Sequence, residues 1–273
     1  MVKRILSFLG LFVLVSAAML VAPVARLMFD PAVQAGDWRT ASRAPQGWAP
    51  APEDYEPAVV QAYSAPTVGW RGAVADHSWI AFKPAGAAFY TRYEVLGWNV
   101  RRNRPAISET QTKTPDQKWY GSAPKLLRDI RGAEAEAIIA AIPAAVASYP
   151  YPNFYQVWPG PNSNTFIAHI AREVPALRLA MPGNTLGKDF TGWNIVAAAP
   201  SGTGYQFSLG GLFGLMLARD EGFEVNILGL VIGANPFQPT LTLPGVGRLP
   251  VRANWTDQKN EVATNTANAA PQP

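Results

Sequence analysis

The stretch YQVWPGPNSNTFIAHIAREVPAL, from Tyr155 to Leu177, joins an extended segment rich in Pro and Gly to a helix. The helix is predicted to begin where Asn162 or Ser163 can cap it, because both side chains accept hydrogen bonds from the free N–H groups of a first turn. A tight loop that brings a small polar residue to a helix N-terminus is also typical of a nucleophile site. Ser163 is therefore interpreted either as a helix cap or as a nucleophile.

The helix of this stretch is amphipathic. One side carries Ser163, Ile167, Ile170 and Val174, with Phe166 beside them. That side is predicted to face the core, whereas Thr165, His169 and Arg172 form the other side. His169 follows Ser163 by six residues, which places it about 9 Å along the axis and about 120° around it. We therefore expect His169 at the surface, and the other of the two histidines, His77, is the one that could serve Ser163.

The segments before this helix predict a small antiparallel sheet with helices packed on it, and hence an α+β fold. Residues 67–74 (TVGWRGAV), 77–84 (HSWIAFKP) and 89–98 (FYTRYEVLGW) have the aromatic and β-branched content of strands. Residues 122–132 (SAPKLLRDIRG) predict a helix between Ser122 and Gly132. Residues 133–149 (AEAEAIIAAIPAAVASY) predict a second, apolar helix that is interrupted near Pro143.

The N-terminal segment predicts a membrane anchor. An apolar run extends from Ile5 to Ala25, and about 20 such residues cross a bilayer core as a helix. The run exceeds the apolar region of a cleaved signal peptide, which is the rival interpretation. Lys3 and Arg4 precede it, so the positive-inside rule keeps the N-terminus in the cytoplasm. In a bacterial cell we expect a single-pass protein of the inner (cytoplasmic) membrane whose domain faces the periplasm.

The remaining segments complete a four-part organisation. We expect an anchor over residues 1–28, a tether or surface wrap over 29–66, one α+β domain over 67–253, and a disordered tail over 254–273. Within the domain, FSLGGLFGLMLA and VNILGLVIGANPF are each too short to span a membrane. They are predicted to form a core helix and a core strand, and a surface hairpin that dips into the bilayer is the alternative.

Composition removes several classes of function. The formal net charge is +4 and the basic residues are scattered, which argues against nucleic-acid binding. The chain has no cysteine, so disulfides, thiolate metal sites and thiol catalysis are excluded. Two histidines make a zinc site unexpected, and we expect no metal and no cofactor.

A strand histidine followed by NSNTF at a helix N-terminus resembles the circularly permuted papain-like hydrolases of the deubiquitinase-like and NlpC-like type. Their nucleophile motif, Asn-Cys-Asn-x-Phe, is matched by Asn162, Asn164 and Phe166, with Ser163 in place of the cysteine. The resemblance implies a permuted papain-like domain with a cleft. The binding residues expected in this cleft are Asn162, Asn164, Phe166 and Trp79. The whole chain also resembles an uncharacterised family of bacterial membrane-anchored proteins of unknown function, which implies no activity.

Serine needs more help than cysteine in such a site. Its hydroxyl stays protonated at neutral pH, so a base must remove the proton, and a third residue usually orients that base. His77 is the expected base, with Glu94 or Asp76 as its partner. Asp76 and His77 are neighbours in a strand and should point to opposite faces, which favours Glu94.

Three functions follow from these features. The first is a membrane-tethered cell-envelope protein whose papain-like cleft binds an unknown ligand without catalysis. The second is a serine-based hydrolase of envelope amide or ester bonds that uses Ser163 and His77. The third is a structural partner of another membrane protein, which an exposed apolar C-terminal half would favour. The expected partners are membrane lipid, through the N-terminal helix, and an envelope component or membrane protein.

Overall fold

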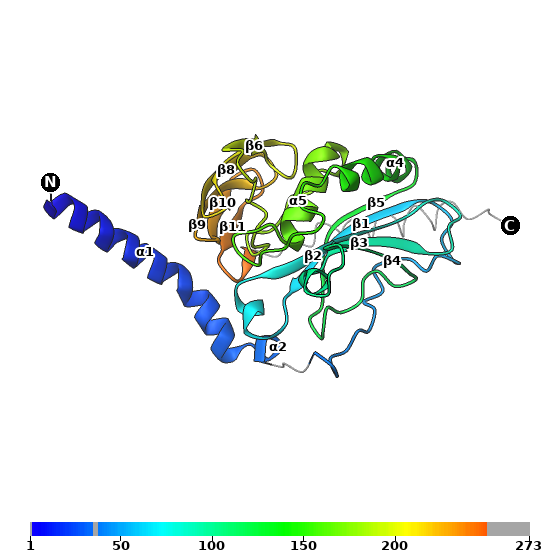
Figure 1. Cartoon of the computed structure of the whole chain (residues 1–273), viewed down its shortest axis with the longest axis horizontal. Helices are drawn as coiled ribbons and strands as arrows, with labels where there is room; N and C mark the ends of the chain where they lie inside the picture. The colour runs from blue at the N-terminus through cyan, green and yellow to red at the C-terminus, as the bar shows by residue number, and fades with distance from the viewer. Residues whose placement is uncertain (1, 35–37, 250–273) are drawn as a thin grey trace.

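Two antiparallel sheets and the helices beside them confirm the α+β class (Figure 1). The computed structural model describes residues 2–34 and 38–249. The helices of this part of the chain are α1 (Val2–Phe29), α2 (Pro31–Gln34), α3 (Gly97–Val100), α4 (Ala133–Ala147) and α5 (Ser163–Glu173), and the 3-10 helices are η1 (Gly69–Ala73) and η2 (Pro175–Leu177).

The first sheet has five strands in the order β4-β3-β2-β1-β5. Its strands are β1 (Val59–Pro66), β2 (Asp76–Lys83), β3 (Tyr90–Val95), β4 (Ile107–Thr112) and β5 (Lys125–Arg131). The predictions of β2 and β3 are confirmed. β1 pairs with β2 along its whole length and with β5 on its other side. The prediction of a tether over residues 29–66 is therefore wrong for β1. Both faces of this strand are buried, so it lacks the polar alternation that marks a half-exposed strand.

Three local predictions are corrected. Residues 122–132 contain β5 rather than a helix, because pairing with β1 overrides a helix-like spacing of Leu126, Leu127 and Ile130. Residues 67–74 contain η1 rather than a strand. α4 runs through Pro143 without interruption, and the buried side chains on both sides of this proline, Ile142 and Ala145, hold the helix in the core.

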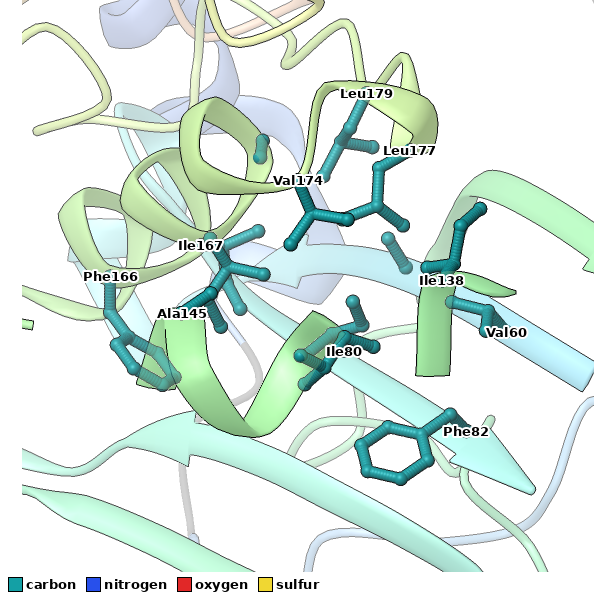
Figure 2. Close-up of a cluster of buried hydrophobic side chains, with 14 of the residues drawn as sticks. Val60, Ile80, Phe82, Ile138, Ala145, Phe166, Ile167, Val174, Leu177 and Leu179 are labelled. Atoms are coloured by element: carbon teal, nitrogen blue, oxygen red, sulfur yellow. The ribbon is translucent and has the colours of Figure 1, made fainter. Parts of the chain in front are cut away.

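The two faces of the five-stranded sheet carry different cores. Figure 2 shows one of them, where Val60, Ile80 and Phe82 of the sheet pack against α4 and α5 through Ile138 and Ile167. The opposite face is built from large aromatic side chains. Its buried members include Tyr63, Trp79, Tyr90 and Trp119, with Trp48 and Tyr55 of the segment before β1 packed on them. This part of the segment before β1 therefore packs on the sheet.

The second sheet is a seven-stranded meander that stands beside α5 (Figure 1). Its strands are β6 (Val196–Ala198), β7 (Gly204–Leu209), β8 (Phe213–Ala218), β9 (Gly222–Ile227), β10 (Leu230–Asn235), β11 (Thr240–Leu243) and β12 (Gly247–Leu249). The prediction of a core helix in FSLGGLFGLMLA is wrong, because β7 and β8 form a hairpin there. Gly210 and Gly211 both adopt positive φ at its turn, a conformation that glycine takes without steric cost.

α1 contains the one described segment that is long and apolar enough to cross a membrane, Leu9–Phe29. By length and composition it is a candidate membrane span or signal anchor. The last turns of α1 contact the domain, where Arg26 pairs with Asp30 at 3.0 Å and donates a hydrogen bond to the carbonyl of Gly245. The predicted tail over residues 254–273 lies outside the described residues.

Candidate functional site

The N-terminus of α5 is capped by Asn162, and Ser163 is the first helical residue. Asn162 Oδ1 accepts hydrogen bonds from the backbone N–H groups of Asn164 at 2.9 Å and Thr165 at 3.1 Å. Thr165 Oγ1 in turn accepts from the backbone N–H of Asn162 at 3.2 Å, which completes a capping box. Asn162, rather than Ser163, therefore satisfies the free N–H groups of the first turn.

The two asparagines of the motif also tie α5 to its surroundings. The amide nitrogen of Asn162 donates to the carbonyls of Val157 and Leu186, both at 2.9 Å. The amide nitrogen of Asn164 donates to the carbonyls of Asp76 and Leu186, both at 2.8 Å. Ser78 Oγ, on β2, donates to Asn164 Oδ1 at 2.7 Å. These contacts occupy the polar atoms of both predicted binding residues within the fold.

The two aromatic binding residues predicted from the sequence are fully buried. Phe166 lies in the core between the five-stranded sheet and the helices, as Figure 2 shows. Trp79 lies in the aromatic core on the other face, and its indole N–H donates to the carbonyl of Pro115 at 2.9 Å. The structure thus gives both side chains packing roles, and neither reaches solvent.

His77 and Glu94 come together as the sequence predicts. His77 Nε2 lies 2.8 Å from Glu94 Oε2, and Arg92 Nη2 donates to the same oxygen at 2.9 Å. Burial raises the pKa of Glu94, but Arg92 and His77 outweigh it and hold this pKa below its usual value. Burial lowers the pKa of His77, against the opposing effect of Glu94. A neutral imidazole that donates from Nε2 to an ionised carboxylate fits both shifts.

The five-stranded sheet separates Ser163 from His77. Side chains alternate along β2, and Ser78 and Ile80 point to the side of α5, where they contact Asn164 and the core. His77 therefore points to the opposite side, together with Trp79, and its ring stacks on Trp119 at 3.8 Å between centroids. The expected Ser163–His77 pair does not form, and among the described residues the Ser163 hydroxyl has no hydrogen-bond partner.

Asp76, the alternative partner of His77, lies on the other face of β2, as strand alternation predicts. Its carboxylate accepts a hydrogen bond from Ser64 Oγ at 3.3 Å, and burial raises its pKa.

His169 differs from its prediction as a surface residue. It is half-buried beside α4, where its Nε2 lies 3.0 Å from Ser148 Oγ and 3.1 Å from the carbonyl of Ala145. A helix wheel gives the direction of a side chain but not the neighbour that covers it.

An aromatic column leads from His77 to the surface, and sequence reasoning missed it. Trp119 stacks on His77 on one side and on Trp98 on the other, with 5.9 Å between the two indole centroids. The Tyr120 ring meets Trp119 edge-on at 4.9 Å, and the Arg43 guanidinium lies 4.2 Å from the Tyr120 ring centroid. The signal was the dipeptide Trp119–Tyr120, but its three partners lie far away in the chain.

The turn that carries Tyr120 is strained. Trp119 and Ser122 form an isolated antiparallel bridge, so Tyr120 and Gly121 are the two central residues of a tight turn. Their φ angles are 46° and 91°. Positive φ at both central positions is typical of a type I′ turn, where Asn-Gly is preferred. A tyrosine in this conformation costs about 1 kcal/mol, and such strain concentrates at functional sites.

A second polar cluster lies between the seven-stranded sheet and α5. Lys188 Nζ is fully buried, 2.8 Å from Glu224 Oε2 and 3.1 Å from Asp189 Oδ1. Burial lowers the pKa of Lys188, but the two carboxylates outweigh it and raise this pKa above its usual value. Asn226 donates to Asp189 Oδ2 at 3.1 Å. Each charge of this cluster therefore has an opposite charge within 3.1 Å.

No group of three or more His, Asp and Glu side chains in residues 2–34 and 38–249 is arranged to hold a metal ion.

Residues 57–190 match the model of a family described as "Protein of unknown function (DUF3750)". The match supports an uncharacterised domain that covers the five-stranded sheet, α4 and α5. Comparisons with curated proteins and with solved structures gave no match. The resemblance to papain-like hydrolases therefore stays a hypothesis.

Proposed function

We propose that the protein is a membrane-anchored, non-catalytic binding module of the cell envelope. The observation that carries this proposal is the position of Ser163 and His77 on opposite sides of the five-stranded sheet. A serine nucleophile needs its base within hydrogen-bond reach, and the sheet prevents this. His77 and Glu94 then serve to support the aromatic column rather than to activate a hydroxyl.

The outer end of the aromatic column is the proposed binding surface. Trp98 is 37% exposed, and Tyr120 and Arg43 lie beside it. The surface is rigid, because Trp98 and Tyr120 both pack against the buried Trp119. An exposed indole ring near a guanidinium suits a ligand with a flat face and a negative charge. This chemistry supports a binding role at a location different from the predicted papain-like cleft.

The outer face of the seven-stranded sheet is the observation that favours another function, a structural partner of a second membrane protein. Large apolar side chains are exposed there, as that alternative requires. The Phe12–Phe213 ring contact places the apolar helix α1 next to this face, which favours lipid rather than a second protein as its occupant. The binding module therefore remains the first proposal. No contact of Ser163 favours the serine hydrolase.

Site-specific photo-cross-linking in cells tests the binding surface. A photoreactive phenylalanine analogue replaces Trp98 in one variant and Phe89, an exposed aromatic residue outside the column, in the control. We expect a defined cross-linked product from position 98 that position 89 does not give. Identical products, or no product from either position, would refute the proposed surface.

A fluorophosphonate probe on the full chain tests the absence of catalysis. We expect no covalent labelling of Ser163 in the wild type, because His77, the base predicted for it, lies on the other side of the sheet. Labelling that disappears in both the Ser163→Ala and the His77→Ala variants would overturn the non-catalytic assignment and restore the hydrolase.

A further inference from the structure

The seven-stranded sheet presents an apolar face to the outside. Between Tyr205 and Ala234, every outward-facing strand position carries an apolar or aromatic side chain and none carries a charge. Tyr205 and Leu217 are 71% and 70% exposed, and Phe207, Leu215, Phe223 and Ile232 are also exposed. These side chains, which we call the outer face, pair across neighbouring strands and form one continuous patch.

The opposite face of the same sheet is buried and largely polar, with Met216, Ala218 and Val231 as apolar members. Gln206, Ser208, Glu224 and Asn226 all point inward, toward the cluster around Lys188. A half-buried sheet of a water-soluble domain has the reverse arrangement, with its apolar side inside. An apolar-out, polar-in alternation is typical of strands that contact lipid. The outer face therefore contributes nothing to the core of the domain and requires a separate explanation.

The two ends of the sheet also differ in charge. The turns at one end, residues 210–212, 228–229 and 244–246, contain no charged residue. The turn between β8 and β9, at the other end, contains Arg219, Asp220 and Glu221. One end of the sheet thus has uncharged turns, whereas the other end has charged residues in one turn, where Glu221 is buried.

α1 crosses the uncharged end. The Phe12 ring lies 6.4 Å from the Phe213 ring at the start of β8. Further along the helix, Arg26 donates a hydrogen bond to the carbonyl of Gly245, in the turn between β11 and β12, and Pro23 lies where a side chain at Gly245 would meet it. Eleven residues of helix cover about 16 Å, close to the roughly 17 Å that separate these strands at ordinary spacing. Figure 1 places α1 and the seven-stranded sheet on the same side of the molecule.

We propose that the outer face binds the acyl-chain region of a lipid bilayer, so that α1 and the seven-stranded sheet form one membrane-contacting surface. Phe12 and Pro23 belong to the candidate membrane span, and the sheet continues its surface without a charged boundary. Among residues 2–34 and 38–249, β6 and β12 are the edge strands of an open sheet, whose outer backbone groups cannot be buried in hydrocarbon. The face therefore lies against one leaflet and does not cross it. This proposal does not depend on the binding surface proposed at Trp98.

Depth measurements with single cysteines test the proposal, because the chain contains no native cysteine. Leu217→Cys and Phe223→Cys place an environment-sensitive fluorophore on the outer face, at the charged end, away from α1. Gln111→Cys, an exposed position on β4, is the matched control. The full chain is reconstituted in phosphatidylcholine–phosphatidylglycerol vesicles, with nitroxide-labelled lipids and aqueous iodide as the two quenchers.

We expect blue-shifted emission, strong quenching by the lipid nitroxides and weak quenching by iodide at positions 217 and 223, and the reverse at position 111. Iodide quenching equal at all three positions would overturn the proposal. Protection from both quenchers, or a disulfide-linked dimer of the unlabelled Leu217→Cys variant, would also overturn it, because a protein surface would then cover the face.

Discussion

At the scale of single residues, the first turn of α5 gives two neighbouring polar side chains different tasks. Asn162 makes the cap and two further hydrogen bonds to carbonyls of Val157 and Leu186, whereas Ser163 makes none of these. The motif N-S-N-T-F is thus explained by folding at four of its positions: two asparagines, a capping-box threonine and a core phenylalanine. Its serine is the one residue of the motif whose side chain makes no structural contact of this kind. Helix capping therefore does not explain the serine, and the sequence left a catalytic role open for it.

Substitutions in this turn should separate the two roles. We expect Asn162→Ala to lower the free energy of unfolding by about 1–3 kcal/mol, since it removes a cap and leaves buried carbonyls unpaired. Ser163→Ala should change it by less than about 0.5 kcal/mol. Urea denaturation of the full chain in detergent, followed by circular dichroism, measures both. A larger loss for Ser163→Ala than for Asn162→Ala would contradict the assignment of the cap.

The buried His77 should make stability depend on pH. Its pKa is lowered in the folded state, so below the ordinary value of about 6.5 the unfolded chain takes up a proton that the folded chain does not. The free energy of unfolding should therefore be constant above about pH 6.5 and decrease as the pH falls below it. His77→Phe, which keeps the stack on Trp119, should reduce this slope.

The same titration can be followed directly by NMR of the imidazole protons. Burial lowers the pKa of His169 as well, so both histidines should titrate below 6.5 and His169→Gln is needed to assign the signals. If His77 titrated above 6.5, its attraction to Glu94 would outweigh burial, and stability would then increase as the pH falls.

At the scale of elements, the two sheets show why some segments could be predicted and others could not. β2 and β3 were predicted from their aromatic and β-branched residues, although β2 is buried on both faces, whereas β1 contains Ala62, Ser64 and Ala65 and was missed. β5 has the apolar spacing of a helix and becomes a strand only because β1 is available for pairing. β7 to β10 alternate clearly, but their apolar side faces outward, so an assignment of apolar residues to the core misplaces them.

The candidate site was predicted in part for a similar reason. The His77–Glu94 contact follows from neighbouring strands, because the two residues lie on the same face of β2 and β3. Arg92 was missed, although its place two residues before Glu94 puts it on that face. The links from Trp119 to Trp98 and from Lys188 to Glu224 join separate elements, and no local pattern records such contacts.

The buried charge cluster between α5 and the second sheet should be sensitive to its cation. Lys188→Met leaves Asp189 and Glu224 buried without a counter-charge, and we expect a loss of about 3–5 kcal/mol in the free energy of unfolding. Adding Glu224→Gln in the same chain should recover part of that loss, since one anion is removed. Chemical denaturation of both variants decides this, and additive losses would show that the two residues are not coupled.

At the scale of the whole molecule, the orientation of the chain in a membrane stays a prediction from Lys3 and Arg4. A periplasm-active reporter fused after Pro273 should be active in a bacterial host, whereas a cytoplasm-active reporter at the same position should be silent. The opposite pattern would place the domain in the cytoplasm. The outer face could still meet lipid in that case, but on the inner leaflet.

The position of β1 has a mechanical consequence for an anchored protein. This strand is the first one after α1 in the chain, yet it lies inside the sheet, paired with β2 and with β5. A pull from the membrane first meets the contacts of α1 and of residues 48–55 with the domain. Once these open, it acts along β1, across hydrogen bonds that stand perpendicular to the strand on both of its sides. Those bonds share the load in shear, whereas an edge strand would peel away one bond at a time.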